Sequence, residues 1–200
     1  GWVRADGLIS RKVLAGIELP KDEVSIEETG WGICGYSFDK RDQVLAFARV
    51  LGFILSDGSI SKNKSNRYEA SVCFGSTMDA TMFCNDIELL TGKLPSITKD
   101  ERYNNTKGNS LFKISIPQLL VTKIISLEGI LIGKRVTQAR SLPKFILDPE
   151  CPKSIIREFL GGLFGGDGTC PSLSVSHPSF SPISFGWTTV EKYKKEMSEV

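Results

Sequence analysis

The stretch LGGLFGGDG, residues 160–168, decides the fold. It continues an apolar helical pattern that begins at Ile155. Each glycine inside a helix costs roughly 1 kcal/mol relative to alanine, so a helix with several glycines needs a compensating contact. The glycines of this stretch form two pairs, each with a spacing of four, so one side of the helix carries almost no side chain. The pattern predicts a second backbone packed closely against this helix, with Asp167 at its last turn.

A second stretch with the same layout, VLGFILSDG, occupies residues 50–58 of the same chain. Both stretches end in Asp-Gly. The similarity continues beyond the aspartates, because Phe74-Gly75-Ser76-Thr77 and Phe185-Gly186-Trp187-Thr188 follow them at nearly equal offsets. This internal repeat predicts two similar halves whose glycine-rich helices pack side by side. The glycines expected at that helix interface are Gly52, Gly161, Gly162 and Gly165.

Composition limits the class of protein. The 200 residues, 40% of them hydrophobic, suit one compact domain or two closely joined halves. The net charge of +2 does not by itself indicate a nucleic-acid-binding protein. No apolar run reaches the length of a membrane span, so no membrane is expected as a partner. The five cysteines form no C-x-x-C pair, which favours a reduced intracellular chain without a zinc site. His177 is expected in a surface loop.

The order of elements predicted for the first half is helix, two strands, helix, two strands, helix. Residues 1–40 are expected to be an N-terminal extension or linker. Gly58, Gly92 and Gly129 are expected to end the three helices. The predicted elements are a helix at 42–57, a hairpin of 59–61 and 67–75 with a basic, amide-rich tip, a helix from Ser76 or Thr77 to Leu90, a hairpin of 94–102 and 110–116, and a helix at 118–127.

The rest of the chain predicts a connection and a second half that stops early. Residues 130–151 are expected to connect the halves, and Pro152 to start the second glycine-rich helix. Strands at 172–176 and 183–187 would follow, and Thr188 with Glu191 forms a capping box for a last helix. The fold class is therefore α+β with αββαββα halves, the first at 41–129 and the second, incomplete, at 152–200. We keep the names first half and second half for these two ranges.

The chemistry predicted from this pattern centres on Asp57 and Asp167. Two glycine-faced helices packed about a pseudo-two-fold axis bring these carboxylates together, where they repel unless a cation lies between them. Oxygen ligands and a phosphate-rich partner favour Mg²⁺, which can activate water for phosphodiester hydrolysis. Asp-Gly after a helix is also an ordinary helix end, so neither aspartate alone would carry this interpretation. A phosphate-binding loop is disfavoured because no lysine follows the glycines, and a calcium loop because the carboxylate spacing is absent.

The hairpins of the first half predict a nucleic-acid surface. The two sheets are expected to form a saddle, and two-stranded ribbons fit the major groove of DNA. The basic side chains suited to phosphates and guanine edges are Lys62, Lys64, Arg67, Lys99, Arg102 and Lys107. A solvated hairpin tip is the alternative reading for any one of them.

These paired stretches resemble the signature of the LAGLIDADG (dodecapeptide) homing endonucleases, over roughly residues 40–200. The resemblance implies that duplex DNA lies across the saddle and that one aspartate from each half, with Mg²⁺ or Mn²⁺, serves the cutting of each strand. The family also places a lysine near the metal-bound water in each half. Lys113 is the candidate in the first half. The equivalent position in the second half would fall beyond Val200, which puts the activity of this polypeptide in doubt.

Three functions fit this resemblance. The first is a site-specific double-strand DNA endonuclease, a monomeric pseudo-dimer associated with an intein or intron. A flanking splicing domain would then be a partner, since the chain lacks the terminal residues that splicing needs. The second is an RNA-binding maturase of the same fold, which loss of one aspartate would favour. The third is a catalytically inactive DNA-binding relic. Because both aspartates are present, the nuclease is preferred.

Overall fold

The computed structural model describes residues 40–100, 111–138 and 142–169, together with Ile33, Phe38 and three short strand pieces near the C-terminus. The elements are helices α3 (Arg41–Ser56), α4 (Thr77–Thr91), α5 (Gln118–Ile125) and α6 (Lys153–Asp167), the 3-10 turns η2 (Arg135–Thr137) and η3 (Lys144–Leu147), and strands β1 (Gly58–Lys62), β2 (Tyr68–Phe74), β3 (Ile97–Asp100), β4 (Leu111–Ser115), β5 (Gly168–Thr169), β6 (Ser172–Leu173), β7 (Phe180–Ser181) and β8 (Ser184–Phe185). The α+β class and the element order predicted for the first half are confirmed.

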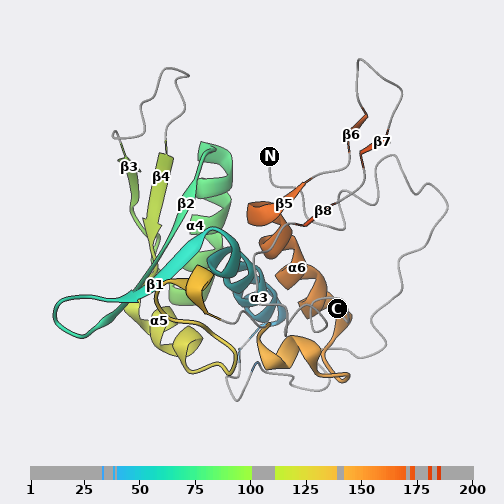
Figure 1. Ribbon diagram of the computed structural model, residues 1–200, viewed down its shortest axis with the longest axis horizontal. Coiled ribbons are helices and arrows are strands. Elements are labelled where there is room, and N and C mark those ends of the chain that lie inside the picture. Colours follow the sequence, from blue (N-terminus) through green and yellow to red (C-terminus); the bar gives the residue numbers. More distant parts are fainter. Residues whose placement is uncertain are drawn as a thin grey trace.

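Helix α3 lies at the centre of the molecule, with α6 on one side and the sheet on the other (Figure 1). Its apolar residues surround the helix, so it is buried on all sides from Ala46 onward. The prediction that Gly58 ends this helix in a left-handed conformation is wrong. Its C-cap is Asp57, with φ −92°, and Gly58 already begins β1. Glycine is required at position 58 for another reason, because a Cβ there would lie 2.6 Å from the Cα of Ile54.

The four strands of the first half form one antiparallel sheet in the order β1-β2-β4-β3. Apolar and polar residues alternate along β2, and burial follows this alternation: Ala70, Val72 and Phe74 are buried, and the residues between them are half-buried. The predicted basic tip joins β1 to β2, closed by a hydrogen bond from the Asn63 amide to the Arg67 carbonyl at 2.9 Å. Helices α3, α4 and α5 pack on the face of the sheet that carries the buried residues. We call this the helix-side face and the opposite one the open face.

Helices α4 and α5 complete the first half. Ser76, one of the two residues predicted to start α4, caps it by accepting a hydrogen bond from the Asp79 amide, and Gly92 ends it with φ +70°, as predicted. Pro117 precedes α5, and this helix ends at Ile125 rather than at the predicted residue 127. Gly129, with φ +95°, therefore lies in the following turn and does not end the helix.

The core is built from aromatic and branched side chains of the first half together with one side of α6. Phe53 of α3 packs edge-to-face on Phe74 and on Phe83, with ring centroids 5.2 and 5.7 Å apart. Such pairs contribute beyond the area they bury. Ile33 is fully buried, and the ring of Phe38 lies 5.4 Å from that of Phe47. These two residues of the segment predicted to be an extension or linker therefore pack with the first half.

Beyond α6 the described strand pieces form two short antiparallel pairs (Figure 1). Strand β5 pairs with β8 and β6 with β7, in one continuous register. Phe185 lies opposite Gly168, the place that Val72 holds opposite Gly58. The sequence repeat matched Phe185 with Phe74, but by strand register Phe185 corresponds to Val72, two residues earlier in β2. The predicted capping box at Thr188 and Glu191 lies outside the described residues.

Candidate metal and nucleic-acid site

Helices α3 and α6 touch through their backbones, as the glycines predict. A Cβ on Gly52 would overlap the carbonyl oxygen of Phe159 and lie 2.7 Å from the amide nitrogen of Leu163. On the other helix, a Cβ on Gly162 would overlap the carbonyl oxygen of Arg49 and lie 3.0 Å from the Phe53 nitrogen. Real Cβ atoms do not approach backbone atoms this closely. At Gly52 and Gly162, any side chain would therefore press on the backbone of the other helix and force the helices apart.

The remaining interface glycines were predicted only in part. A Cβ on Gly161 would meet nothing within 4 Å, and Gly165 is exposed, so neither lies at the interface. Gly166 does, because a Cβ there would lie 2.6 Å from the Cβ of Ser56. The prediction of Gly161 and Gly165 was wrong because four glycines at this spacing form two adjacent faces, and only one of them meets α3.

The contact at Gly166 leads directly to the aspartates. A Cβ on Gly166 would lie 2.9 Å from Oδ2 of Asp57, so this carboxylate rests against the last turn of α6, where Asp167 is the next residue. Removal of water by neighbouring protein atoms raises the pKa of Asp57 above its ordinary value of 3.8, and the negative charge of Asp167 raises it further. The positive charge of Arg135 acts in the opposite direction. Asp57 and Asp167 are thus brought together as predicted.

The aspartate pair suits a cation that keeps much of its water. The Asp57 side chain is exposed and Asp167 is half-buried, so solvent and a ligand can reach both. Within the described residues no group of three or more His, Cys, Asp or Glu side chains is placed to hold a metal ion. Two carboxylates without a full protein cage match the way Mg²⁺ binds, through one or two carboxylates with water and phosphate completing the octahedron. The residues present therefore fit Mg²⁺ or Mn²⁺ better than a structural metal.

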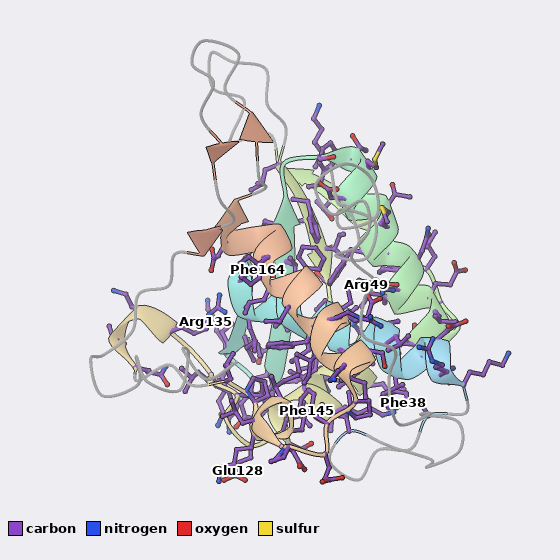
Figure 2. All side chains as sticks on the ribbon, turned by 90° about the vertical axis from the view of Figure 1, so that its right-hand side faces the viewer. Phe38, Arg49, Glu128, Arg135, Phe145 and Phe164 are labelled. Atoms are coloured by element: carbon purple, nitrogen blue, oxygen red, sulfur yellow. The ribbon has the colours of Figure 1, made fainter. Side chains whose placement is uncertain are left out.

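Arg135, on the connection between the halves, is a site residue that the sequence analysis missed. Figure 2 labels its side chain on that connecting segment. The guanidinium donates hydrogen bonds to backbone carbonyls at the end of α3 and the start of β1. Among these, Nη1 lies 3.1 Å from the oxygen of Ile54 and Nη2 lies 2.9 Å from that of Ser56. No local pattern at position 135 indicates this role, because the partners are about 80 residues away in sequence.

Lys113 is exposed on the open face of β4, where it pairs with Cys73 of β2 and Thr98 of β3. Gly58 of β1 pairs with Val72 of β2, so one further step along these strands would place Asp57 opposite Cys73. Cys73 in turn pairs with Lys113 of β4, so Asp57 and Lys113 are separated by two strand spacings. Two strand spacings amount to about 10 Å, a gap that a lysine side chain largely spans. This extension of the register sets Lys113 level with Asp57.

The predicted basic set divides between the two faces of the sheet. Lys62 pairs with Tyr68, its ammonium 4.9 Å from the ring centroid, and Lys99 pairs with Phe112. By register, both lysines lie on the helix-side face, so they do not share a surface with Lys113. Lys64 and Arg67 are exposed at the β1–β2 hairpin tip. Arg102 and Lys107 lie outside the described residues.

The open face carries many hydroxyl side chains, a feature that sequence analysis did not single out. Its side chains are exposed or half-buried. Most are short and polar, and the hydroxyl-bearing ones are Ser59, Ser61, Ser71, Thr98 and Ser115. Hydroxyls of this kind donate to phosphate oxygens and to base edges, while their small size lets a backbone approach closely. The signal was present in the alternation of the strands, but only the register shows which polar residues adjoin.

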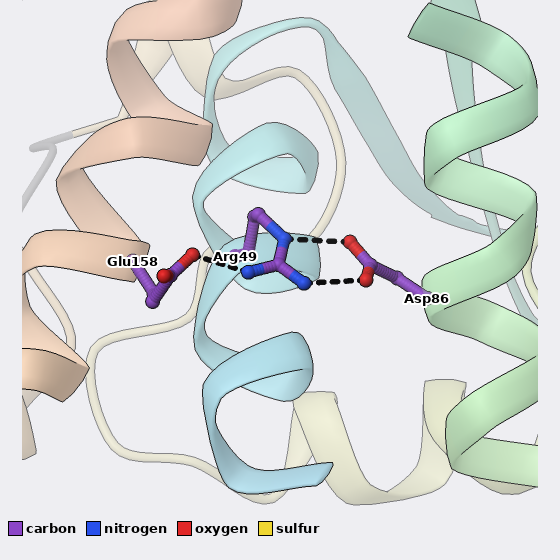
Figure 3. A network of polar contacts seen from close by, with 3 residues as sticks. All are labelled: Arg49, Asp86 and Glu158. Carbon is purple, nitrogen blue, oxygen red and sulfur yellow. Dashed lines mark hydrogen bonds and ion pairs between the residues drawn. The ribbon is translucent and has the colours of Figure 1, made fainter. Parts of the chain in front are cut away.

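A buried ion-pair network joins the three long helices (Figure 3). Arg49 of α3 donates from Nε and Nη2 to Asp86 of α4, at 2.7 and 2.5 Å, and from Nη1 to Glu158 of α6. Burial lowers the pKa of Arg49, but the hydrogen bonds and charges of the two carboxylates raise it by more, so the guanidinium stays charged. The network fixes α6 in register against α3 and therefore helps to align Asp167 with Asp57.

Comparison with known proteins gives a partial likeness. No protein-family model matches the chain. The replication factor C small subunit of Methanocaldococcus jannaschii is 33% identical over 151 residues, which are 73% of this chain and 8% of that relative. This chain thus spans only about 8% of the length of that curated relative.

Solved structures with some similarity are homing endonucleases. Mesophilic variants of I-DmoI give a TM-score of 0.39 at 16% identity, covering 64% of each chain, and I-DmoI in complex with DNA and Mn gives 0.38 at 16% identity, again with 64% of each. I-WcaI bound to its DNA recognition sequence gives 0.39 at 12% identity, covering 78% of this chain and 61% of that one.

A membrane-spanning helix is absent from the part of the chain that the structure describes. None of its helices combines the length and the apolar character that a bilayer crossing requires.

Proposed function

We propose that the protein is a site-specific double-strand DNA endonuclease whose divalent metal ions are held at the paired carboxylates of Asp57 and Asp167, with each aspartate serving the cutting of one strand. The observation that carries this proposal is the meeting of these carboxylates at the ends of two helices packed backbone to backbone. A fold that places two like charges side by side in reach of solvent loses stability unless a cation joins them. The LAGLIDADG-like pair of stretches from which the carboxylates come supports the same reading.

The bound metal would be Mg²⁺ or Mn²⁺, and it would supply an activated water and charge stabilisation for phosphodiester hydrolysis. The chain's own groups would do the rest. Asp57 and Asp167 hold the cation, while the rigid contact at Gly52 and Gly162 fixes their separation. Lys113 is proposed to place its ammonium beside the scissile phosphate, where its charge offsets that of the phosphate.

The DNA is proposed to lie along the open face. The hydroxyl side chains of this face and Lys113 would contact it, and Lys64 and Arg67 at the hairpin tip would contact phosphates at its margin. Lys62 and Lys99 lie on the helix-side face, so we do not include them among the residues proposed to contact DNA. Arg102 and Lys107, which fall between β3 and β4 in the sequence, remain predicted contacts.

The proposed context is a segment embedded in a longer polypeptide, such as an intein with its splicing domain or a reading frame within an intron. A match that occupies only 8% of a curated relative supports an embedded segment. Within it, the first and second halves would act as one monomeric pseudo-dimer, one aspartate from each half serving one DNA strand.

The test is cleavage of a randomised plasmid library in Mg²⁺, followed by sequencing of the breaks. The unaltered protein should linearise a small set of plasmids, whereas Asp57→Asn and Asp167→Asn should each abolish double-strand cleavage. Asp42→Asn is the matched control, because Asp42 is exposed at the opposite end of α3. It should cut like the unaltered protein.

Three other outcomes separate the alternatives. Full linearisation by both aspartate variants would rule out the metal assignment. Binding of DNA without any cleavage in Mg²⁺ or Mn²⁺ would indicate a relic. Binding of structured RNA in preference to duplex DNA would indicate a maturase.

A further inference from the structure

The guanidinium of Arg135 brackets the backbone of Asp57. Nη1 donates to the carbonyls of Ile54 and Leu55, and Nη2 to those of Ser56 and Gly58. Three of these acceptors belong to the last turn of α3, and the fourth is the first residue of β1. One side chain therefore holds the chain on both sides of the single residue that separates helix from strand.

These carbonyls need such a donor. The last four carbonyls of an α-helix have no partner within the helix, and a left-handed cap commonly satisfies some of them. Helix α3 has no such cap, because Asp57 is right-handed and β1 begins at the next residue. Arg135 provides the missing donors, and its positive charge lies at the negative end of the helix dipole.

The same connecting segment is also tied to β1. The amide of Gly133 donates to the carbonyl of Ile60 at 2.7 Å, and Gly133 has φ +90°, which favours glycine. The side chain of Gln138 donates to the carbonyl of Ile132 at 2.8 Å and closes the segment on itself. Arg135 thus belongs to a segment that is hydrogen-bonded both to the end of α3 and to the edge strand β1.

We propose that Arg135 is a positioning residue for Asp57, directing its carboxylate toward Asp167 by fixing the backbone before and after it. This inference rests on the proposed function, in which Asp57 serves one DNA strand and Asp167 the other. Arg135 holds the Asp57 side of the site, so its loss should impair the cutting of one strand more than the other. A lysine cannot replace it, because a single ammonium cannot reach four carbonyls in the planar geometry of a guanidinium.

The experiment compares Arg135→Gln and Arg135→Lys with Lys134→Gln, the matched control at the exposed neighbouring position. The substrate is a supercoiled plasmid selected in the library test, and each nick is mapped to its strand. One strand is the strand that Asp57→Asn fails to cut. Both Arg135 variants should cut this strand about 10- to 100-fold more slowly than the unaltered protein, as expected for a displaced catalytic group. The other strand should be cut at close to the normal rate, and Lys134→Gln should cut both strands normally.

Amide hydrogen exchange gives a second readout that does not depend on activity. Residues 57–60 should exchange faster in both Arg135 variants and at the normal rate in Lys134→Gln. If Arg135→Gln does not fold, Arg135→Lys carries both measurements. Equal slowing on both strands in proportion to lost thermal stability, or normal cutting by Arg135→Lys, would overturn the proposal. If the unaltered protein cuts no plasmid, the proposed function fails by itself, and unchanged exchange at residues 57–60 would then reject the positioning role as well.

Discussion

Helices α3 and α6 carry similar sequence stretches but are packed very differently. Twelve of the sixteen residues of α3 are buried, whereas five of the fifteen residues of α6 are. Helix α3 passes through the core between the sheet, α4 and α6, so it can be apolar all round. Helix α6 packs along one side only, which leaves Gly161 without a neighbour and Gly165 exposed. The shared motif therefore specifies one contact between two helices, not a shared environment.

The difference also concerns how each aspartate is held. Asp57 lies between a helix and a four-stranded sheet, with Arg135 bonded to the carbonyls on either side of it. Asp167 is the last residue of α6 and leads into a two-residue strand. Two residues with matching positions in the repeat thus depend on different surroundings, and substitutions in the two helices should have different effects.

The largest expected effect comes from one methyl group added to α6. Gly162→Ala should destabilise the protein by about 3 kcal/mol or more, because the Cβ would overlap the Arg49 carbonyl and backbones cannot yield. Gly161→Ala, one residue away, should instead stabilise it by about 0.5–1 kcal/mol, since alanine is the better helix former and the site is open. Urea denaturation of both variants measures the difference. Similar stability of the two variants would refute the backbone contact.

A second large effect should come from the ion pairs that tie α6 to α3. Arg49→Met should cost about 3–5 kcal/mol, because it leaves the carboxylates of Asp86 and Glu158 partly buried and unpaired. The control is Lys144→Met, which breaks an ion pair with Glu128 in which both side chains are about two-thirds exposed. That change should cost about 0–1 kcal/mol. Equal losses in thermal denaturation would show that the Arg49 network does not stabilise the helix packing.

Much of the first half could be predicted from the sequence because its signals are local. The Ser76 cap, the left-handed Gly92 and the alternation of β2 each involve residues within a few positions of one another. The pairing of Asp57 with Asp167 was predictable for a different reason, since the repeat itself relates two distant segments.

The errors arose where the outcome depends on a partner that the pattern does not specify. Which glycines of α6 face α3 depends on the rotation of the helix, so Gly161 was included and Gly166 missed. The face on which Lys62 lies depends on strand register, in which a shift of one residue reverses the side. Arg135 acts on carbonyls about 80 residues away, a relation that only the folded connection creates.

The two faces of the sheet can be compared with two lysines that lie on neighbouring strands. Lys113 and Lys99 are both exposed and carry the same charge, but register places them on opposite faces. Lys113→Gln should reduce the slope of log affinity against log salt by about 0.9 if its ammonium neutralises one phosphate. Lys99→Gln should leave the slope unchanged. Binding to the selected duplex in Ca²⁺ at several salt concentrations measures both, and a change confined to Lys99→Gln would move the DNA to the helix-side face.

The smallest effect should be a pH-dependent change in stability at Asp57. Because folding raises its pKa, folding favours the protonated carboxyl. The associated stability is fully present below the ordinary pKa of 3.8 and is lost as the pH rises through the raised value. Asp57→Asn cannot ionise, so in EDTA it should melt slightly above the unaltered protein at neutral pH and at nearly the same temperature below pH 3.8. At neutral pH, added Mg²⁺ should make the unaltered protein melt above Asp57→Asn, because only the unaltered protein keeps both carboxylates to bind the ion. A melting difference that stays constant from acid to neutral pH would mean that neither desolvation nor the charge of Asp167 raises the pKa of Asp57 in the folded protein.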